Sequence, residues 1–174
     1  MGKNISELIL NRRSIRKYKA GGAPTREQLK QLLEAAMLAP SARNTRPWEF
    51  IAITKKEILD EIPKIHNHAG MCVSAGAAIL VVALPPKDMD TFPYEFYAQD
   101  CGAATQNILL EAVNLGLGTC WCGVYPLEER VKGFRKLLNL EEDKIPFGII
   151  AVGTPDENPD RRGFYDESRA KYID

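Results

Sequence analysis

The chain has no excess of charge of either sign, because 23 lysine and arginine residues balance 23 aspartate and glutamate residues. This balance gives no general electrostatic reason to expect a nucleic-acid partner. Long hydrophobic runs are also missing: the longest, from Ala75 to Pro86, is too short to cross a bilayer. The first residues lack a signal-peptide pattern, since Lys3, Asn4 and Glu7 interrupt any apolar stretch. We therefore expect a cytoplasmic protein that binds neither nucleic acid nor membrane.

Cysteine and histidine are too few, and too poorly spaced, to indicate a metal site. The four cysteines form no C-x-x-C pair, which is a common spacing of zinc ligands. A disulfide framework is not expected in a cytoplasmic chain of this size. His66 and His68 precede Cys72 and leave a faint metal alternative, but two loop histidines beside a buried thiol explain the pattern better. We expect no metal ion.

Motifs of the common catalytic and nucleotide-binding classes are missing as well. There is no G-x-S-x-G, no P-loop, no H-E-x-x-H and no G-x-G-x-x-G that opens a helix. With two histidines in the chain, no Ser/His/Asp or Cys/His arrangement stands out. A protein without an evident acid, base or nucleophile is expected to use the chemistry of a cofactor.

The length and composition indicate one soluble domain. A chain of 174 residues with 45% hydrophobic and 26% charged residues accommodates one buried core and hardly two. Residue spacing predicts helices at 5–11, 25–38, 55–63, 94–115 and 127–138, strands at 50–53, 78–83, 118–124 and 147–152, a mobile loop at 64–70, and a second loop at 85–93. Helices and strands that alternate in this way indicate a three-layer α/β or α+β sandwich.

Two clusters of basic residues lie far apart in the sequence. The first comprises Arg12, Arg13, Arg16, Lys17 and Lys19 around Ser14, and the second is Arg161 with Arg162. Attraction of cations to the dipole at a helix end is a sufficient structural explanation of the first cluster. Three arginines around one serine nevertheless offer more planar donors than a helix end needs, and guanidinium groups match phosphate and carboxylate geometry. We therefore predict that the clusters bind a compact anion.

A loop rich in hydrogen-bond donors connects the helix at 25–38 to the strand at 50–53. It reads Pro40-Ser41-Ala42-Arg43-Asn44-Thr45-Arg46-Pro47-Trp48, and its two prolines prevent a helix from continuing. Its hydroxyl, carboxamide and guanidinium groups suit a polar, planar or anionic ligand, although an ordinary solvated connection is the alternative. Gly123 ends another strand at a point where the backbone can approach a ligand closely.

Four stretches, in this order along the chain, resemble the flavin-dependent nitroreductase family. They are residues 12–16, residues 40–48, the sequence Gly-Leu-Gly-Thr-Cys-Trp-Cys-Gly at 116–123, and Gly153-Thr154-Pro155 leading to Arg161-Arg162. Residues 165–169 also look like the tails of short family members. The resemblance implies an α+β fold with a mainly antiparallel sheet, a single domain at residues 1–174, and an intertwined homodimer in which residues 154–174 pack on the partner subunit.

The resemblance also implies FMN at the dimer interface, held by residues of both subunits. Its cofactor-binding residues are Arg12, Arg13, Ser14 and Arg16, then Pro40, Ser41, Ala42 and Asn44 from the other subunit, and finally Trp121, Cys122, Gly123, Arg161 and Arg162. Arginines suit the charged phosphate, and a guanidinium at the pyrimidine edge, the place implied for Arg16, should raise the reduction potential of the flavin. Which of the last two arginines dominates phosphate binding is left open.

The implied activity is hydride transfer from NADH or NADPH, followed by reduction of a nitroaromatic, quinone or similar small molecule in a ping-pong mechanism. No side chain is implied as a catalytic residue. Two alternatives remain: a flavin enzyme of the same fold with another reaction, such as reductive dehalogenation or flavin destruction, and a non-catalytic flavin-binding module. Arg46 stands where many relatives have glutamine, so it either favours acidic substrates or NADPH, or is a surface residue. Cys122 is either a redox-active thiol or a small core residue.

Overall fold

A computed structural model of the chain describes residues 5–85 and 96–173. Its strands are β1 (Trp48–Ile53), β2 (Ala77–Ala83), β3 (Gly118–Gly123) and β4 (Ile145–Gly153). Its α-helices are α1 (Glu7–Asn11), α2 (Arg26–Met37), α3 (Lys56–Ile65), α4 (Cys72–Ala75), α5 (Phe96–Asn114) and α6 (Glu128–Leu138). Short 3-10 helices are η1 (Ala42–Asn44), η2 (Asn67–Ala69) and η3 (Glu167–Arg169).

The strands of the described residues form one antiparallel sheet in the order β1-β2-β4-β3. Every residue of β2 is buried, because the strand is paired on both edges and covered on both faces. Ile79 and Val81 point to one core, and Leu80 and Val82 point to the other. This alternation follows from the two-residue period of a strand.

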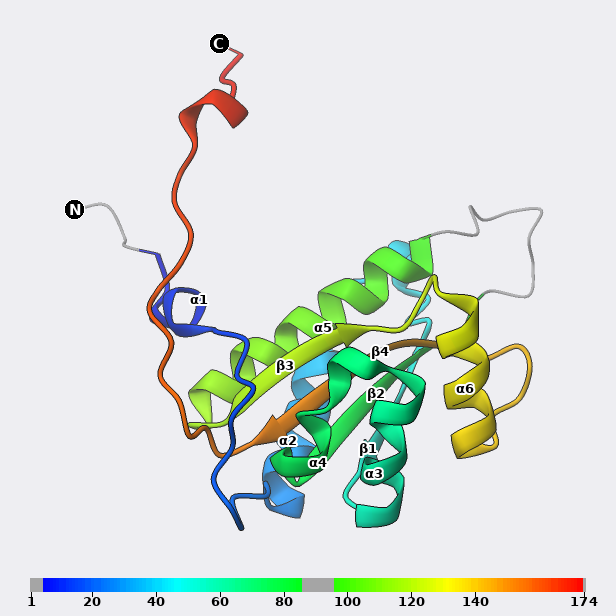
Figure 1. Cartoon of the computed structure of the whole chain (residues 1–174). Helices are drawn as coiled ribbons and strands as arrows, with labels where there is room; N and C mark the ends of the chain where they lie inside the picture. The colour runs from blue at the N-terminus through cyan, green and yellow to red at the C-terminus, as the bar shows by residue number, and fades with distance from the viewer. Residues whose placement is uncertain (1–4, 86–95, 174) are drawn as a thin grey trace.

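Helices cover both faces of the sheet, as Figure 1 shows. Helices α2 and α5 pack on the face of Ile79 and Val81, and α3, α4 and α6 pack on the face of Leu80 and Val82. The three-layer sandwich and the antiparallel sheet that were expected are therefore confirmed. Within the part of the chain that the structure describes, no helix is both long enough and apolar enough to cross a membrane.

Helix α2 begins at a capping box and ends before Pro40. The Thr25 hydroxyl accepts a hydrogen bond from the backbone N–H of Gln28 at 3.1 Å, and the Gln28 side chain accepts one from the N–H of Thr25 at 2.9 Å. Two of the unpaired N–H groups at the helix start are satisfied in this way. Leu29, Leu32 and Ala36 then face α5 and the sheet.

The prediction of a mobile loop at residues 64–70 was wrong. Helix α3 continues through Pro63 to Ile65, and η2 follows at once. His66 is only 3% exposed and Ala69 is fully buried. A stretch with polar residues was taken as solvated, but the His66 imidazole finds hydrogen-bond partners in the interior. The other predicted loop lies largely outside the described residues, as does the start of the helix predicted at 94–115, which the structure describes from Phe96.

Beyond β4 the chain leaves the body of the molecule. Pro155 pairs with Tyr18 in an isolated bridge, and the Glu157 carboxylate accepts hydrogen bonds from the backbone N–H groups of Arg16 and Lys17. The rest of the tail then extends away past α1, as Figure 1 shows in orange and red. Its apolar side chains Phe164, Tyr165, Tyr172 and Ile173 are exposed.

Candidate functional site

The two basic clusters meet at one hollow on the surface. Arg13, Ser14, Arg16 and Arg162 line a cavity of about 440 Å³, which Lys17, Glu157 and Pro159 complete. Residues separated by more than a hundred positions come together here because the start of the tail lies beside the segment that follows α1. The structure thus brings together part of each predicted anion-binding cluster.

Strand-like contacts position the basic segment. The backbone N–H of Ile15 donates to the carbonyl of Thr119 on β3 at 2.8 Å, and the Ile15 side chain is buried. Alternation along an extended backbone then turns Arg16 outward. The Glu157 carboxylate accepts from the N–H groups of Arg16 at 2.5 Å and Lys17 at 3.1 Å. These bonds, that of Arg16 first, hold the pKa of Glu157 below its usual value.

Arg13 carries a donor that no residue described by the structure satisfies. Its Nε is buried and has no hydrogen-bond partner among the described residues. A buried unpaired donor costs free energy, and a phosphate oxygen in the adjoining hollow would satisfy it. The donor set and this orphan atom therefore fit a phosphorylated ligand.

Arg12 and Arg161 lie outside this hollow, although Arg161 shares another cavity, of about 380 Å³, with Arg13. Arg12 is the C-cap residue of α1, where its backbone N–H donates to the carbonyl of Leu8 at 3.0 Å. Arg161 Nη2 donates to Glu7 Oε2 and to Asn11 Oδ1, both at 2.8 Å. Neither Arg12 nor Arg161 is among the residues that line the 440 Å³ hollow.

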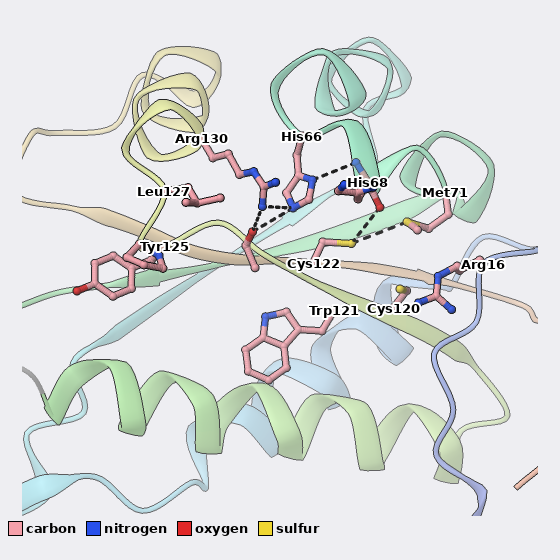
Figure 2. Close-up of a pocket in the computed structure, with 12 residues that line it drawn as sticks. Arg16, His66, His68, Met71, Cys120, Trp121, Cys122, Tyr125, Leu127 and Arg130 are labelled. Carbon is pink, nitrogen blue, oxygen red and sulfur yellow. Dashed lines mark hydrogen bonds between the residues drawn. The ribbon is translucent and has the colours of Figure 1, made fainter. Parts of the chain in front are cut away.

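A larger cavity of about 770 Å³ adjoins this hollow at Arg16, which lines both. Cys120, Cys122 and Gly123 border it from β3, together with Trp121, whose side chain lies on the opposite face of the strand (Figure 2). A glycine on β4 makes room for the indole, since a Cβ at Gly148 would lie 2.5 Å from Trp121 Nε1. The three strand residues predicted to line a flavin therefore share one cavity with Arg16.

A hydrogen-bonded group that the sequence did not indicate closes one side of this cavity. His66 Nδ1 accepts from the backbone N–H of His68 at 3.2 Å, so Nε2 carries the proton and donates to the carbonyl of Gly123 at 3.0 Å. Arg130 Nη1 donates to the same carbonyl at 2.9 Å and lies 3.1 Å from His66 Nε2. Burial and then the Arg130 charge lower the pKa of His66, which favours the neutral imidazole.

The thiols of Cys120 and Cys122 lie on one face of β3. All four cysteines of the chain are free thiols. A hydrogen bond from Cys122 lowers the pKa of Cys120 to about 7, and the same interaction raises the pKa of Cys122. Cys122 Sγ is also 3.5 Å from the carbonyl of His68. Within residues 5–85 and 96–173, no group of three or more metal-ligating side chains is arranged to hold a metal ion.

The loop at 40–46 lies against α5 and does not line the hollow that Arg13, Arg16 and Arg162 share. Arg43, Asn44 and Arg46 have positive φ angles of 51°, 57° and 49°, a strained conformation for residues other than glycine. The backbone N–H of Ala42 donates to Asp100 Oδ1 at 3.1 Å. Pro40, Ser41, Ala42 and Asn44 line neither of the two cavities that contain Arg16.

Sequence reasoning missed Glu157, Asp100, His66 and Arg130. Glu157 lies in a polar tail, and Arg130 lies in an amphipathic helix, so neither position shows a local signal. Asp100 does have one, because it interrupts the apolar pattern of α5 and is 7% exposed. Its Oδ2 is buried and without a partner among the described residues.

Comparison with known proteins matches the description "Nitroreductase family" to residues 9–84 and 71–154. A protein of Methanothermobacter thermautotrophicus, provisionally named an NADH dehydrogenase/NAD(P)H nitroreductase, is 45% identical over 95% of this chain and 85% of its own. An NADPH-flavin oxidoreductase of Vibrio harveyi is 28% identical over 90% of this chain and 68% of its own.

A solved structure shows that the likeness extends to the fold. The FMN-dependent nitroreductase of Clostridium difficile R20291 superposes with a TM-score of 0.85 and 29% identity, over 96% of this chain and 98% of that one. The matched segments contain the basic residues after α1, the loop at 40–48 and strand β3, which are three of the four stretches that carried the resemblance. The chain therefore belongs to the nitroreductase family.

Proposed function

We propose that the protein is an FMN-dependent oxidoreductase that takes a hydride from NADH or NADPH and reduces nitroaromatics, quinones or related acceptors by a ping-pong mechanism. The observation that carries this proposal is the meeting of Arg13, Ser14, Arg16 and Arg162 at one hollow that adjoins the larger cavity beside β3. The cofactors named for the family members above support it. The chemistry that FMN supplies when bound is electron transfer between a nicotinamide and an acceptor.

The residues of the smaller hollow would hold the phosphate of the cofactor. Arg162 and Arg13 bring two guanidinium groups, and the orphan Nε of Arg13 gains the acceptor that it lacks. The Glu157 carboxylate accepts hydrogen bonds from the backbone N–H groups of Arg16 and Lys17, and so it fixes the basic segment. Within the described part of the chain, it forms no ion pair with Arg13 or Arg162. Arg12 and Arg161, which border the group from α1 and the tail, contribute charge from further away.

Arg16 would lie at the pyrimidine edge of the ring, since it borders both cavities. Its positive charge stabilises negative charge that develops at that edge, which favours the reduced state. Trp121, Cys122 and Gly123 would support the ring from the strand. With no separate nucleotide-binding motif in the sequence, nicotinamide and acceptor would occupy the same cavity in turn.

The site would be completed by a second subunit in a homodimer. Within one chain, Pro40, Ser41, Ala42 and Asn44 lie apart from the arginines, so they would serve the cofactor of the partner. The exposed apolar residues of the extended tail would be buried if residues 154–174 packed on the partner subunit. We place this dimer in the cytoplasm, with a small molecule as the remaining partner.

The proposal is tested with the purified full-length chain. It should be yellow, release FMN on denaturation in a ratio of about one per chain, and lose its flavin colour when NADH or NADPH is added without oxygen. Addition of a nitroaromatic or a quinone should restore the colour. A protein that stays colourless in the presence of added FMN contradicts the proposal. Slow bleaching by both nicotinamides points to another flavin reaction, and FMN binding without any turnover points to a binding module.

A further inference from the structure

The larger cavity has a positively charged lining. Of the 12 described residues that line it, Arg16 and Arg130 carry a positive charge, and none is an aspartate or glutamate. Arg16 lies at one end of the cavity, where the proposed cofactor site begins. Arg130 lies at the other end, beside Tyr125 and Leu127, as Figure 2 shows. If Arg16 serves the cofactor, the guanidinium of Arg130 remains for a second ligand.

Among the residues that the structure describes, none neutralises the charge of Arg130. Its Nη1 donates to the Gly123 carbonyl at 2.9 Å, and a carbonyl oxygen carries no formal charge. His66, its other neighbour at 3.1 Å, carries no negative charge in either of its common protonation states. In the same helix, Glu128 forms an ion pair with Lys132 at 2.7 Å. Among the described ion pairs none involves Arg130, so its remaining N–H groups can serve an anion.

The contacts of Arg130 also hold its side chain in place before a ligand arrives. One end of the fork is fixed to Gly123, whose carbonyl is fixed in turn by His66. A guanidinium that is already oriented loses less side-chain entropy when it binds. Arg46 is also held, since its Nε donates to Asn44 Oδ1 at 3.1 Å on the loop after α2. Unlike Arg130, however, Arg46 does not line the cavity.

The walls beside Arg130 suit a flat ring. Tyr125 stacks on Phe147 with ring centroids 6.5 Å apart and an angle of 24° between the planes. Tyr125 is 36% exposed and Leu127 is 50% exposed, so both present apolar surface to the cavity. A ligand that combines an aromatic ring with a compact anion would use the apolar walls and the guanidinium together.

We infer that Arg130 determines specificity, by binding a carboxylate or phosphate group on a flat ligand that enters this cavity. The inference deepens the proposed oxidoreductase activity and rests on it. The anion has two sources: an acidic acceptor, such as an aromatic carboxylate, or the phosphate groups of the nicotinamide nucleotide. Both present the same chemistry to Arg130, and the experiment separates them.

The experiment compares 4-nitrobenzoate with 4-nitrobenzamide, its neutral analogue of the same shape, and NADPH with NADH. The variants are Arg130→Gln, Arg130→Lys and, as the matched control, Lys132→Gln, which removes an exposed cation from the same helix. Arg130→Gln removes a charge-assisted hydrogen bond to the ligand, and the free energy of such a bond is large enough that kcat/KM for the charged ligand should fall by about 10-fold or more. The kcat/KM for the neutral analogue should change by less than about twofold in Arg130→Gln. Arg130→Lys should show a smaller loss with the charged ligand. Lys132→Gln should leave kcat/KM unchanged for both ligands.

The pattern of losses identifies the source of the anion. A selective loss with 4-nitrobenzoate assigns the subsite to the acceptor, and a selective loss with NADPH relative to NADH assigns it to a nucleotide phosphate. Equal losses for charged and neutral ligands, or no loss at all, overturn the inference. Flavin content and circular dichroism show whether each variant is folded. Arg130→Lys keeps the charge but loses the planar fork of the guanidinium, so a smaller loss with the same selectivity is expected from it if Arg130→Gln fails to fold, and no selective loss would overturn the inference.

A binding measurement separates the failure of this inference from the failure of the proposed function. Benzoate cannot be reduced in this reaction, and calorimetry reports its binding to the purified wild-type chain without any turnover. We expect benzoate to bind, and Arg130→Gln to weaken that binding by about 10-fold or more. Arg130-dependent binding in a protein that oxidises neither nicotinamide contradicts the proposed function and supports the subsite. Binding that is absent, or that Arg130→Gln leaves unchanged, excludes the acidic acceptor as the source of the anion, and together with the absence of a selective loss with NADPH it overturns the subsite even if the enzyme is active.

Discussion

Arg161 and Arg162 are neighbours in the chain but face different partners. Arg161 is bound to Glu7 and Asn11 of α1, and more than half of its side chain is exposed. Arg162 lines the hollow that Arg13, Ser14 and Arg16 share. Because successive residues of an extended chain point in different directions, only one of the two can face the hollow. This difference supplies a matched pair of variants for the proposed phosphate site.

We expect Arg162→Ala to weaken FMN binding by about 10-fold or more, since it removes a charge-assisted contact with the phosphate. Arg161→Ala should weaken it by less than about threefold, because an exposed ion pair contributes little and its charge is further from the hollow. Quenching of FMN fluorescence on binding to the flavin-free protein measures both constants. Equal losses in the two variants, or a greater loss in Arg161→Ala, would show that the assignment of the phosphate to Arg162 is wrong.

Helices α2 and α5 hold the strained loop at 40–46 in place. Helix α2 packs on α5 and ends at the loop, and Asp100 of α5 accepts a hydrogen bond from Ala42. Each residue with positive φ costs about 1 kcal/mol or more, and such strain persists only where the surroundings hold it. The stability of α2 is therefore important to the shape of a loop that we assign to the partner's cofactor.

The capping box of α2 is testable by itself. Thr25→Ala removes the hydroxyl that accepts from Gln28, and it should lower the free energy of unfolding by about 1 kcal/mol. Thr54→Ala is the control, because Thr54 is exposed and precedes α3 without capping it. Its effect should be less than about 0.5 kcal/mol. Urea denaturation followed by circular dichroism measures both, and equal effects would contradict the role assigned to the cap.

At the scale of the whole molecule, the extended tail and the position of the loop at 40–46 are both consistent with the second subunit that we propose. Apolar side chains are exposed on the tail, and the loop at 40–46 lies away from the arginine hollow of its own chain. A tail that reached a partner would bury these side chains, and the same contact could bring the partner's loop to the cofactor. Both observations would then have one cause.

Removal of residues 164–174 should therefore convert a dimer to a monomer and lower the flavin content of the protein. Size-exclusion chromatography with light scattering gives the mass, and FMN released on denaturation gives the content. A full-length variant with Phe164→Ser and Tyr165→Ser should weaken the dimer in the same direction without shortening the chain. A full-length protein that binds FMN as a monomer would overturn the proposed arrangement.

Local pattern was sufficient for most of the fold. The period of apolar residues placed α2, α5, α6 and the four strands to within a few residues. The reason is that the buried face of a helix or strand shows as a repeat of apolar residues within a short stretch of sequence. The capping box of Thr25 was also visible as spacing. The loop expected at 64–70 was wrong because the exposure of His66 depends on Gly123, which is 57 positions away.

The sequence by itself determined the layered α+β architecture, the absence of common catalytic motifs and, through four ordered stretches, the family. Only the tertiary structure decided that Arg162 and not Arg161 lines the hollow, that Glu157 orders the basic segment, and that Arg130 lies in the cavity without an ion pair among the described residues. The physical reason is that periodicity is a property of neighbouring residues. The meeting of side chains depends instead on strand register and chain path, which in the Arg16–Glu157 contact join residues 141 positions apart.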